Sequence, residues 1–141
     1  MKTVYLTRRE RFNAAHKLWV ADWSPERNQE VFGKCANANW HGHNYELFVT
    51  VKGQPDPVTG FVMDAKQLST LVRKEVTKHL DHSNLNLDVA WVPKGMQATT
   101  ENMCLLIWNR LAPHIEATGA QLHRIRLHET ENIFAEVYDE G

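Results

Sequence analysis

The sequence lacks several features that would assign it to a common functional class. Its 141 residues carry 16 Lys and Arg against 17 Asp and Glu without a basic tail or charge block, so neither nucleic acid nor an anionic membrane is an expected partner. No apolar run approaches the roughly 18 residues of a membrane-spanning helix. The first residues also lack the apolar core of a signal peptide. A Gly-rich dinucleotide-binding motif is likewise missing.

Cysteine is scarce as well. Cys35 and Cys104 lie in unrelated contexts and form no Cys-x-x-Cys pair. Such sparse cysteine is typical of a reducing compartment, so we expect a cytoplasmic protein with free thiols. A chain of this length is expected to form one domain, residues 1–141, with a hydrophobic core that needs no disulfide.

Hydrophobic periodicity predicts the secondary structure. Apolar and polar residues alternate in four segments, predicted as strands at 3–16, 43–52, about 121–129 and 133–138. Apolar spacings of three and four predict helices from 64 to about 78 and from 99 or 100 to about 114, the second ending near Pro113. A short helix is expected near 25–31, and 81–98 is expected to be a polar loop.

The predicted order β-β-α-α-β-β is typical of an α+β domain. The simplest arrangement is a four-stranded antiparallel sheet that carries both helices on one face. Its other face and its two edges would remain uncovered, and uncovered edges invite pairing with another chain. Oligomerisation through these edges into a closed barrel would cover them.

Three histidines lie where they can bind one metal ion. His41 and His43 flank Gly42, and residues i and i+2 of a strand point to the same face. His16 is expected to complete the site from a neighbouring strand. Three protein ligands leave the fourth position of zinc open, as in catalytic zinc sites. The alternative is chance, because eight histidines in 141 residues produce close pairs without any metal.

The two cysteines have different surroundings. Cys104 belongs to the apolar side of a predicted helix, as a small buried residue would. Cys35 lies in a polar, glycine-containing loop before the histidine pair, where a metal or Lys34 would favour its thiolate. We interpret Cys35 as a reactive residue. The sequence leaves open whether it acts as a base or as a fourth zinc ligand.

Asp81 and His82 follow the first long helix as a candidate catalytic pair. A carboxylate beside an imidazole can fix its tautomer and raise its basicity. Adjacent residues rarely face each other, but the turn after a helix can bring them together. The alternative is a solvated aspartate followed by a histidine that caps the helix.

Glu129 is a candidate ligand-binding carboxylate. It shares the parity of the apolar residues Ile125 and Leu127 in the third strand, where a carboxylate needs a partner. A carboxylate can accept two parallel N–H donors, and the amino-pyrimidinone edge of a pterin or guanine offers that pair. The alternative is a strand-end residue in contact with water. Glu101 can likewise be a first-turn acid favoured by the helix dipole.

These pieces occur together and in order along nearly the whole chain. They are Phe12-Asn13-Ala14-Ala15-His16, Cys35 followed after five residues by His41-Gly42-His43-Asn44-Tyr45, Asp56-Pro57-Val58-Thr59-Gly60 with Met63-Asp64, Leu80-Asp81-His82-Ser83-Asn84-Leu85, Thr99-Thr100-Glu101-Asn102, and His128-Glu129-Thr130. The combination resembles the family of 6-pyruvoyltetrahydropterin and 6-carboxy-tetrahydropterin synthases, although each piece alone is unspecific.

The resemblance implies the tunnelling fold, in which three chains close a twelve-stranded barrel and two barrels stack into a homohexamer, a dimer of trimers. It also implies a zinc cofactor. By position, the resemblance assigns zinc binding to His16, His41 and His43, the catalytic thiolate to Cys35, a proton-relay pair to Asp81 and His82, and pterin contacts to Glu129, Thr99, Thr100 and Glu101.

The implied activity is that of a lyase of tetrahydrobiopterin-type biosynthesis, which converts 7,8-dihydroneopterin triphosphate to 6-pyruvoyl-tetrahydropterin with loss of triphosphate. Five residues separate Cys35 from His41, as is typical of this branch, whereas the queuosine-pathway 6-carboxy-tetrahydropterin synthases usually have three. That branch, an aldolase-like variant and a non-catalytic metal- or pterin-binding module are the alternatives.

Some positions lie outside this assignment. Lys17, Lys34 and Arg11 are candidates for contact with the triphosphate. Trp40 stands where relatives often have a smaller residue, and the loop 91–98 matches no part of the family pattern. Both departures are expected to affect the mouth of the pocket.

Overall fold

A computed structural model describes residues 2–140 of the protein. Its centre is a sheet of β1 (Val4–His16), β2 (His41–Gly53), β3 (Ser83–Asn84), β4 (Gln121–Thr130) and β5 (Ile133–Tyr138). The strands lie in the order β3-β1-β2-β4-β5. The four long strands are antiparallel to their neighbours, whereas the two-residue β3 is parallel to β1.

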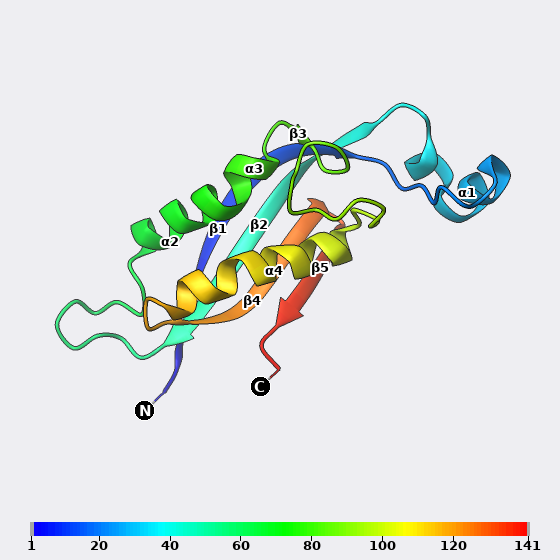
Figure 1. The fold of residues 1–141 in the computed structure, drawn as a ribbon. Helices are drawn as coiled ribbons and strands as arrows, with labels where there is room; N and C mark the ends of the chain where they lie inside the picture. The colour runs from blue at the N-terminus through cyan, green and yellow to red at the C-terminus, as the bar shows by residue number, and fades with distance from the viewer. Residues whose placement is uncertain (1, 141) are drawn as a thin grey trace.

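Two helical segments cover one face of the sheet (Figure 1). The first consists of α2 (Ala65–Val72), the π-helical turn η2 (Arg73–Thr77) and α3 (Lys78–Leu80), and the second is α4 (Thr100–Glu116). A smaller helical segment, α1 (Pro25–Phe32) with the 3₁₀ turn η1 (Gly33–Ala36), lies beyond the ends of β1 and β2 that carry the histidines. The connection between those two strands is therefore placed next to the candidate site.

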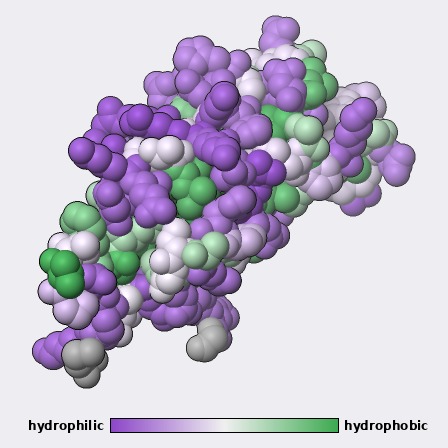
Figure 2. Space-filling model, turned by 60° about the vertical axis from the view of Figure 1, so that its left-hand side comes forward, coloured by the Kyte–Doolittle hydropathy of each residue, from purple (hydrophilic) through white to green (hydrophobic). Residues whose placement is uncertain are grey.

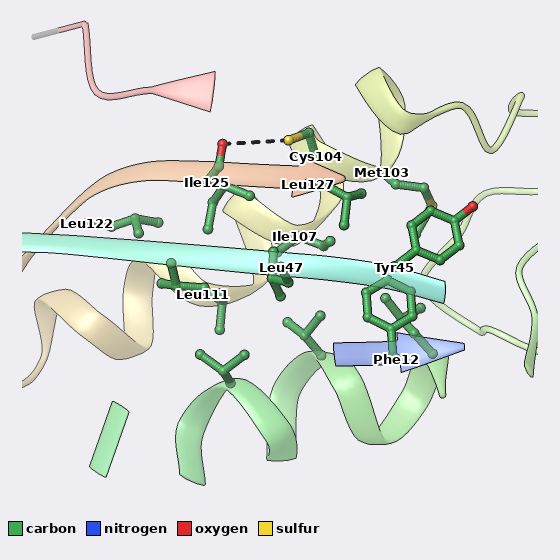
Figure 3. Packing of buried hydrophobic residues seen from close by; sticks show 14 of the residues in the cluster. Phe12, Tyr45, Leu47, Met103, Cys104, Ile107, Leu111, Leu122, Ile125 and Leu127 are labelled. Carbon is green, nitrogen blue, oxygen red and sulfur yellow. Dashed lines mark hydrogen bonds between the residues drawn. The ribbon is translucent and has the colours of Figure 1, made fainter. Parts of the chain in front are cut away.

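The hydrophobic core lies between the sheet and these helices (Figure 3). Leu47 and Ile125 on the strands pack with Ile107 and Leu111 of α4, and all four are fully buried. Cys104 belongs to the same cluster, with its Sγ 3.7 Å from the carbonyl oxygen of Ile125. Burial raises the pKa of this thiol to about 12, so Cys104 is a core residue, as its helical position predicts.

The predicted order of the long elements is confirmed, but the sheet prediction needs correction. The sheet has five strands and is mixed, because Ser83 and Asn84 pair with Ala14 and Ala15 in parallel. A two-residue strand is too short to show alternation in a sequence. The expected polar loop 81–98 therefore contains part of the sheet.

The helix predictions are confirmed with shifted ends. The first long helix continues past 78 to Leu80, and Pro113 lies inside the last turn of α4, which ends at Glu116. The expected short helix is present as α1, where Ser24 accepts a hydrogen bond from the backbone of Arg27. Within residues 2–140, no helix is long and apolar enough to cross a membrane.

The second face of the sheet carries polar contacts, and no helix within the described residues 2–140 covers it (Figure 1). The hydroxyl oxygens of Thr7 and Thr50 lie 2.7 Å apart, and Arg9 pairs with Glu46 at 3.4 Å. Exposed apolar side chains lie on the two outer long strands, at Val4 and Tyr5 of β1 and at Ile133, Phe134 and Tyr138 of β5. Such edges are suited to contact with further chains.

Candidate metal centre

Adjacent ends of β1 and β2 bring the three histidines together. The antiparallel register pairs His16 with His41 and Ala14 with His43, so all three imidazoles share the face that carries the core. One nitrogen from each ring lies within 4.8 Å of the other two. The three side chains thus converge as expected from the i, i+2 spacing and the neighbouring strand, and their nitrogens can bind one ion.

A backbone carbonyl orients the ring of His16. The Nδ1 atom of His16 lies 2.8 Å from the carbonyl oxygen of Ala98. Because a carbonyl oxygen can only accept, Nδ1 carries a proton, so a neutral His16 ring would offer the lone pair of Nε2. Metal-bound histidines usually have a partner of this kind on the second nitrogen. Ala98 directly precedes Thr99, the N-cap of α4, so the start of that helix helps to position the ligand.

Glu129 reaches the same place from the end of β4. Its Oε1 lies 3.2 Å from Nε2 of His16 and 3.5 Å from Nε2 of His43. The contact with His16 is the largest cause that holds the pKa of Glu129 below its ordinary value, against the opposing effect of burial. Glu129 is therefore an anionic group beside the histidines.

The electrostatics favour neutral imidazoles, the form that binds metals. Burial, with the neighbouring histidines, lowers the pKa of His41, and burial also lowers the pKa of His43. The Nε2 atoms of His16 and His43 are buried and make no hydrogen bond within residues 2–140, because the approach of Glu129 is close but poorly aligned. Buried polar atoms normally have partners. The three rings therefore fit a metal ion, and three ligands of this type suit zinc.

Asp81 and His82 form a pair in which the two side chains meet. His82 Nδ1 lies 2.9 Å from Asp81 Oδ2. His82 has a positive φ of 57°. This conformation is uncommon for a residue other than glycine and is found most often at functional sites. The backbone N–H of Asn13 donates to Asp81 Oδ1 and is the largest cause that lowers the pKa of Asp81.

Cys35 lies outside the group of potential metal ligands. It belongs to η1 and is partly exposed, and its carbonyl oxygen accepts a hydrogen bond from the backbone of Leu18, two residues beyond His16. Among the residues that the structure describes, no hydrogen bond joins Cys35 to the histidines or to Asp81 and His82. The structure thus brings together the histidines with Glu129, and Asp81 with His82, but within residues 2–140 it shows no hydrogen bond between Cys35 and either group.

The remaining predicted site residues lie at the start of α4. Thr99 caps the helix by accepting a hydrogen bond from the backbone N–H of Asn102 at 3.2 Å. Thr100 is buried, and Glu101 is exposed in the first turn. These positions follow Ala98, so the segment assigned to pterin contact adjoins His16.

Sequence analysis did not identify two residues, Gln97 and Asn86, whose side chains bind the backbone of the segment that follows His16. The amide of Gln97 bonds to both backbone groups of Trp19, at 2.9 Å and 2.8 Å. Asn86 does the same for Lys17, at 3.1 Å and 3.0 Å. The loop 91–98, which has no counterpart in the family pattern, thereby fixes the segment after His16. The contact of Ala98 with His16 is made by a backbone oxygen, which every residue type has, so the sequence does not indicate it.

Comparison with known proteins identifies the family. A family model described as 6-pyruvoyl tetrahydropterin synthase matches residues 5–140. The chain belongs to this family. It is 42% identical over 127 residues to a 6-pyruvoyl tetrahydrobiopterin synthase of Poecilia reticulata, which covers 90% of this chain and 84% of the relative. The corresponding human protein is 39% identical over 127 residues, covering 90% of this chain and 86% of its own.

A solved structure extends the comparison to the fold. The 6-pyruvoyl tetrahydropterin synthase of Caenorhabditis elegans superposes with a TM-score of 0.89 at 31% sequence identity, covering 99% of this chain and 98% of that chain. The resemblance inferred from the motifs is therefore confirmed, and so is the expectation that the protein is an enzyme of this lyase family.

Proposed function

We propose that the protein converts 7,8-dihydroneopterin triphosphate to 6-pyruvoyl-tetrahydropterin with elimination of triphosphate, using zinc held by His16, His41 and His43. The observation that carries this proposal is the convergence of three histidine nitrogens with the Glu129 carboxylate in a chain of this family. This arrangement suits a ligand that offers N–H donors to a carboxylate while its side chain lies beside a metal.

The histidines are proposed to bind zinc, and Glu129 is proposed to bind the pterin ring. A zinc ion bound there would supply Lewis-acid polarisation of the side-chain oxygens and so acidify the neighbouring C–H bond. The hydrogen bond to Ala98 keeps His16 in the tautomer that leaves Nε2 free for the ion. Glu129 accepts two N–H donors from the pterin ring and thereby sets the direction of the substrate side chain.

The remaining residues move protons. Cys35 acts as the base, and its thiolate removes the carbon-bound proton. His82 delivers or accepts protons at the pterin ring or side chain, and Asp81 fixes its tautomer through the contact at 2.9 Å. The conversion is an internal redox reaction, so its electrons balance without a nicotinamide.

Lys17 is the triphosphate candidate that adjoins a proposed zinc ligand in the chain. It follows His16 directly, and its Nζ lies 4.8 Å from the centre of the Trp19 ring and 5.7 Å from that of Trp40. These rings hold the ammonium group by cation–π attraction. Arg11 precedes His16 by five positions in β1, which amounts to roughly 17 Å along a strand.

The proposed assembly is a cytoplasmic homohexamer. Exposed apolar side chains on the two outer long strands, such as Tyr5 and Phe134, support pairing of β1 in one copy with β5 in the next. Closure of three chains into a barrel and stacking of two barrels would leave no long unpaired edge. Both thiols are free, as expected in a reducing compartment.

Identification of the product tests the proposed reaction. The zinc-loaded protein is incubated with 7,8-dihydroneopterin triphosphate, and the products are identified by mass. We expect 6-pyruvoyl-tetrahydropterin and one triphosphate for each substrate consumed. A 6-carboxy product, an aldolase-type cleavage product or unchanged substrate would each contradict the proposal.

A further inference from the structure

A basic groove lies apart from the histidines, between the outer edge of β1 and the helical segment α2–η2–α3. Its volume is about 690 Å³. The cationic residues that line it are Arg8, Arg9, Arg11, Arg73, Lys74 and Lys78, and its carboxylates are Glu10 and Asp81. The side of the molecule that Figure 1 shows at the left, with α2, comes forward in Figure 2, where hydrophilic side chains cover much of it.

Glu10 forms ion pairs with two of these arginines, Arg8 and Arg73, and so orients their side chains. Its side chain is only 8% exposed, and its oxygens lie 3.1 Å from Nε of Arg8 and 3.2 Å from Nε of Arg73. Ser69 donates a further hydrogen bond to Glu10 at 2.6 Å. Each guanidinium group thus uses its Nε for Glu10, while 41% of the Arg8 side chain and 63% of the Arg73 side chain remain exposed. The outer nitrogens are therefore fixed and available to an anion.

The π-helical turn η2 directs further cations to the same groove. The backbone N–H of Lys78 bonds to the carbonyl oxygen of Arg73, five residues earlier, which defines the turn. Such turns insert one residue into a helix and occur often at functional sites. Arg73, Lys74, Thr77 and Lys78 all line the groove. Within residues 2–140, neither Lys74 nor Lys78 is part of an ion pair, so their charges are not neutralised by the fold.

We propose that this groove binds the oligophosphate group of a small molecule. Planar guanidinium groups and ammonium groups together are the donors that recognise phosphate oxygens. Six cationic and two anionic side chains line the groove, so its net charge is positive, although the whole protein has a net charge of −1. One of the two carboxylates, Glu10, is buried. Thr77 adds a hydroxyl group to the same wall.

The lining also limits the ligand class. Among residues 2–140, no aromatic or aliphatic residue lines the groove, so it offers no surface on which a nucleobase can stack. Recognition therefore rests on phosphate charge and hydrogen bonding alone. The groove adjoins the proposed catalytic pair, because Asp81 is one of its lining residues and accepts a hydrogen bond from the backbone of Asn13, three residues before His16. Neither Lys17 nor any of the three metal-site histidines is among those lining residues.

Calorimetric titration of the zinc-loaded protein with sodium tripolyphosphate tests this site. Lys74→Gln/Lys78→Gln is the informative variant, because both residues are exposed and bear no ion pair. We expect its affinity for tripolyphosphate to fall at least about tenfold, as two charge-assisted hydrogen bonds are lost. The charge-matched variant Lys66→Gln/Lys94→Gln, with both changes outside the groove, should bind like the wild type.

Three results would overturn the proposal. The first is equal affinity of the Lys74/Lys78 variant and the wild type, which would assign any binding to the metal or to Lys17. The second is the absence of wild-type binding at millimolar tripolyphosphate. The third is tight binding of a single-stranded RNA without binding of tripolyphosphate. Turnover of dihydroneopterin triphosphate is measured in parallel, so failure of this site and failure of the proposed reaction are distinguished.

Discussion

Glu129 Oε1 lies 3.2 Å from His16 Nε2, although the two residues belong to β4 and β1, which lie on either side of β2. A carboxylate in this position can bind the ring of a ligand whose side chain reaches the same histidines. The contact also lowers the pKa of Glu129, so the side chain is ionised at neutral pH and can accept two N–H donors. The proposed pterin anchor and the proposed metal ligands therefore lie beside each other.

Replacing Glu129 should weaken substrate binding without emptying the metal site. In Glu129→Gln we expect kcat/KM to fall by about 10- to 100-fold, because a charged hydrogen-bond acceptor is lost. Zinc content should remain near one ion per chain by elemental analysis. Glu131→Gln, an exposed change two residues later, is the matched control and should behave like the wild type. Loss of zinc in Glu129→Gln would make Glu129 a ligand instead of an anchor.

Cys35 should be needed for proton transfer and not for metal binding, because it lies outside the histidine group. Cys35→Ala is expected to keep about one zinc per chain and to lose a factor of about 10² to 10⁴ in rate. His82→Ala should show a similar loss with its metal retained. Cys104→Ala, in the core, should stay active. If Cys35→Ala empties the site, Cys35 is a fourth ligand and the proposed first step is wrong.

The buried carboxylate Glu10 should make stability depend on acid pH. Burial alone would raise the pKa of Glu10, but hydrogen bonds from Ser69, Arg8 and Arg73 outweigh it and lower the pKa below the ordinary 4.5. A lowered folded-state pKa gives stability that is complete above 4.5 and is lost as the pH falls through the folded value. Its contribution therefore disappears in acid.

The variant Glu10→Gln tests this dependence. At neutral pH it should unfold about 1–3 kcal/mol more easily than the wild type, because two guanidinium groups lose their acceptor. The difference should shrink as the pH drops below about 4.5, measured by urea unfolding at one fixed protein concentration. A difference that stays constant over this interval would mean that Glu10 acts by packing alone.

The apolar side chains on the outer strands predict a hexamer in solution. Sizing with light scattering should give about six times the chain mass of 16.3 kDa. Charges on one of these strands, as in Ile133→Lys/Phe134→Glu, should shift the distribution to smaller species, whereas changes at the exposed Val58 should not. A monodisperse monomer of the wild type would contradict the barrel assembly.

Much of this architecture is readable from the sequence because it depends on local periodicity. Alternation along β1 and β2 correctly placed His16, His41 and His43 on one face, and the N-cap residue Ser24 marked α1. The parity of Glu129 with Ile125 and Leu127 indicated that its side chain faces the core side. Motif order then identified the family.

Other structural features could not be predicted, because they depend on tertiary contacts that produce no pattern in the sequence. β3 is two residues long and is set by its pairing with Ala14 and Ala15. The orientation of His16 comes from a backbone carbonyl, that of Ala98, in a loop with no family counterpart. The sequence predicts the pairing of Asp81 with His82, but it does not indicate the positive φ of His82. The closeness of Glu129 to the histidines follows only from the tertiary fold.

The most direct test of the central claim is the metal content of the wild type and of His43→Ala, measured together with triphosphate release from dihydroneopterin triphosphate. The wild type should contain one zinc per chain, lose triphosphate release on treatment with a chelator and regain it when zinc is restored. His43→Ala should retain the oligomer but lose most metal and activity. Full zinc occupancy in His43→Ala, or triphosphate release by the metal-free wild type, would contradict the account.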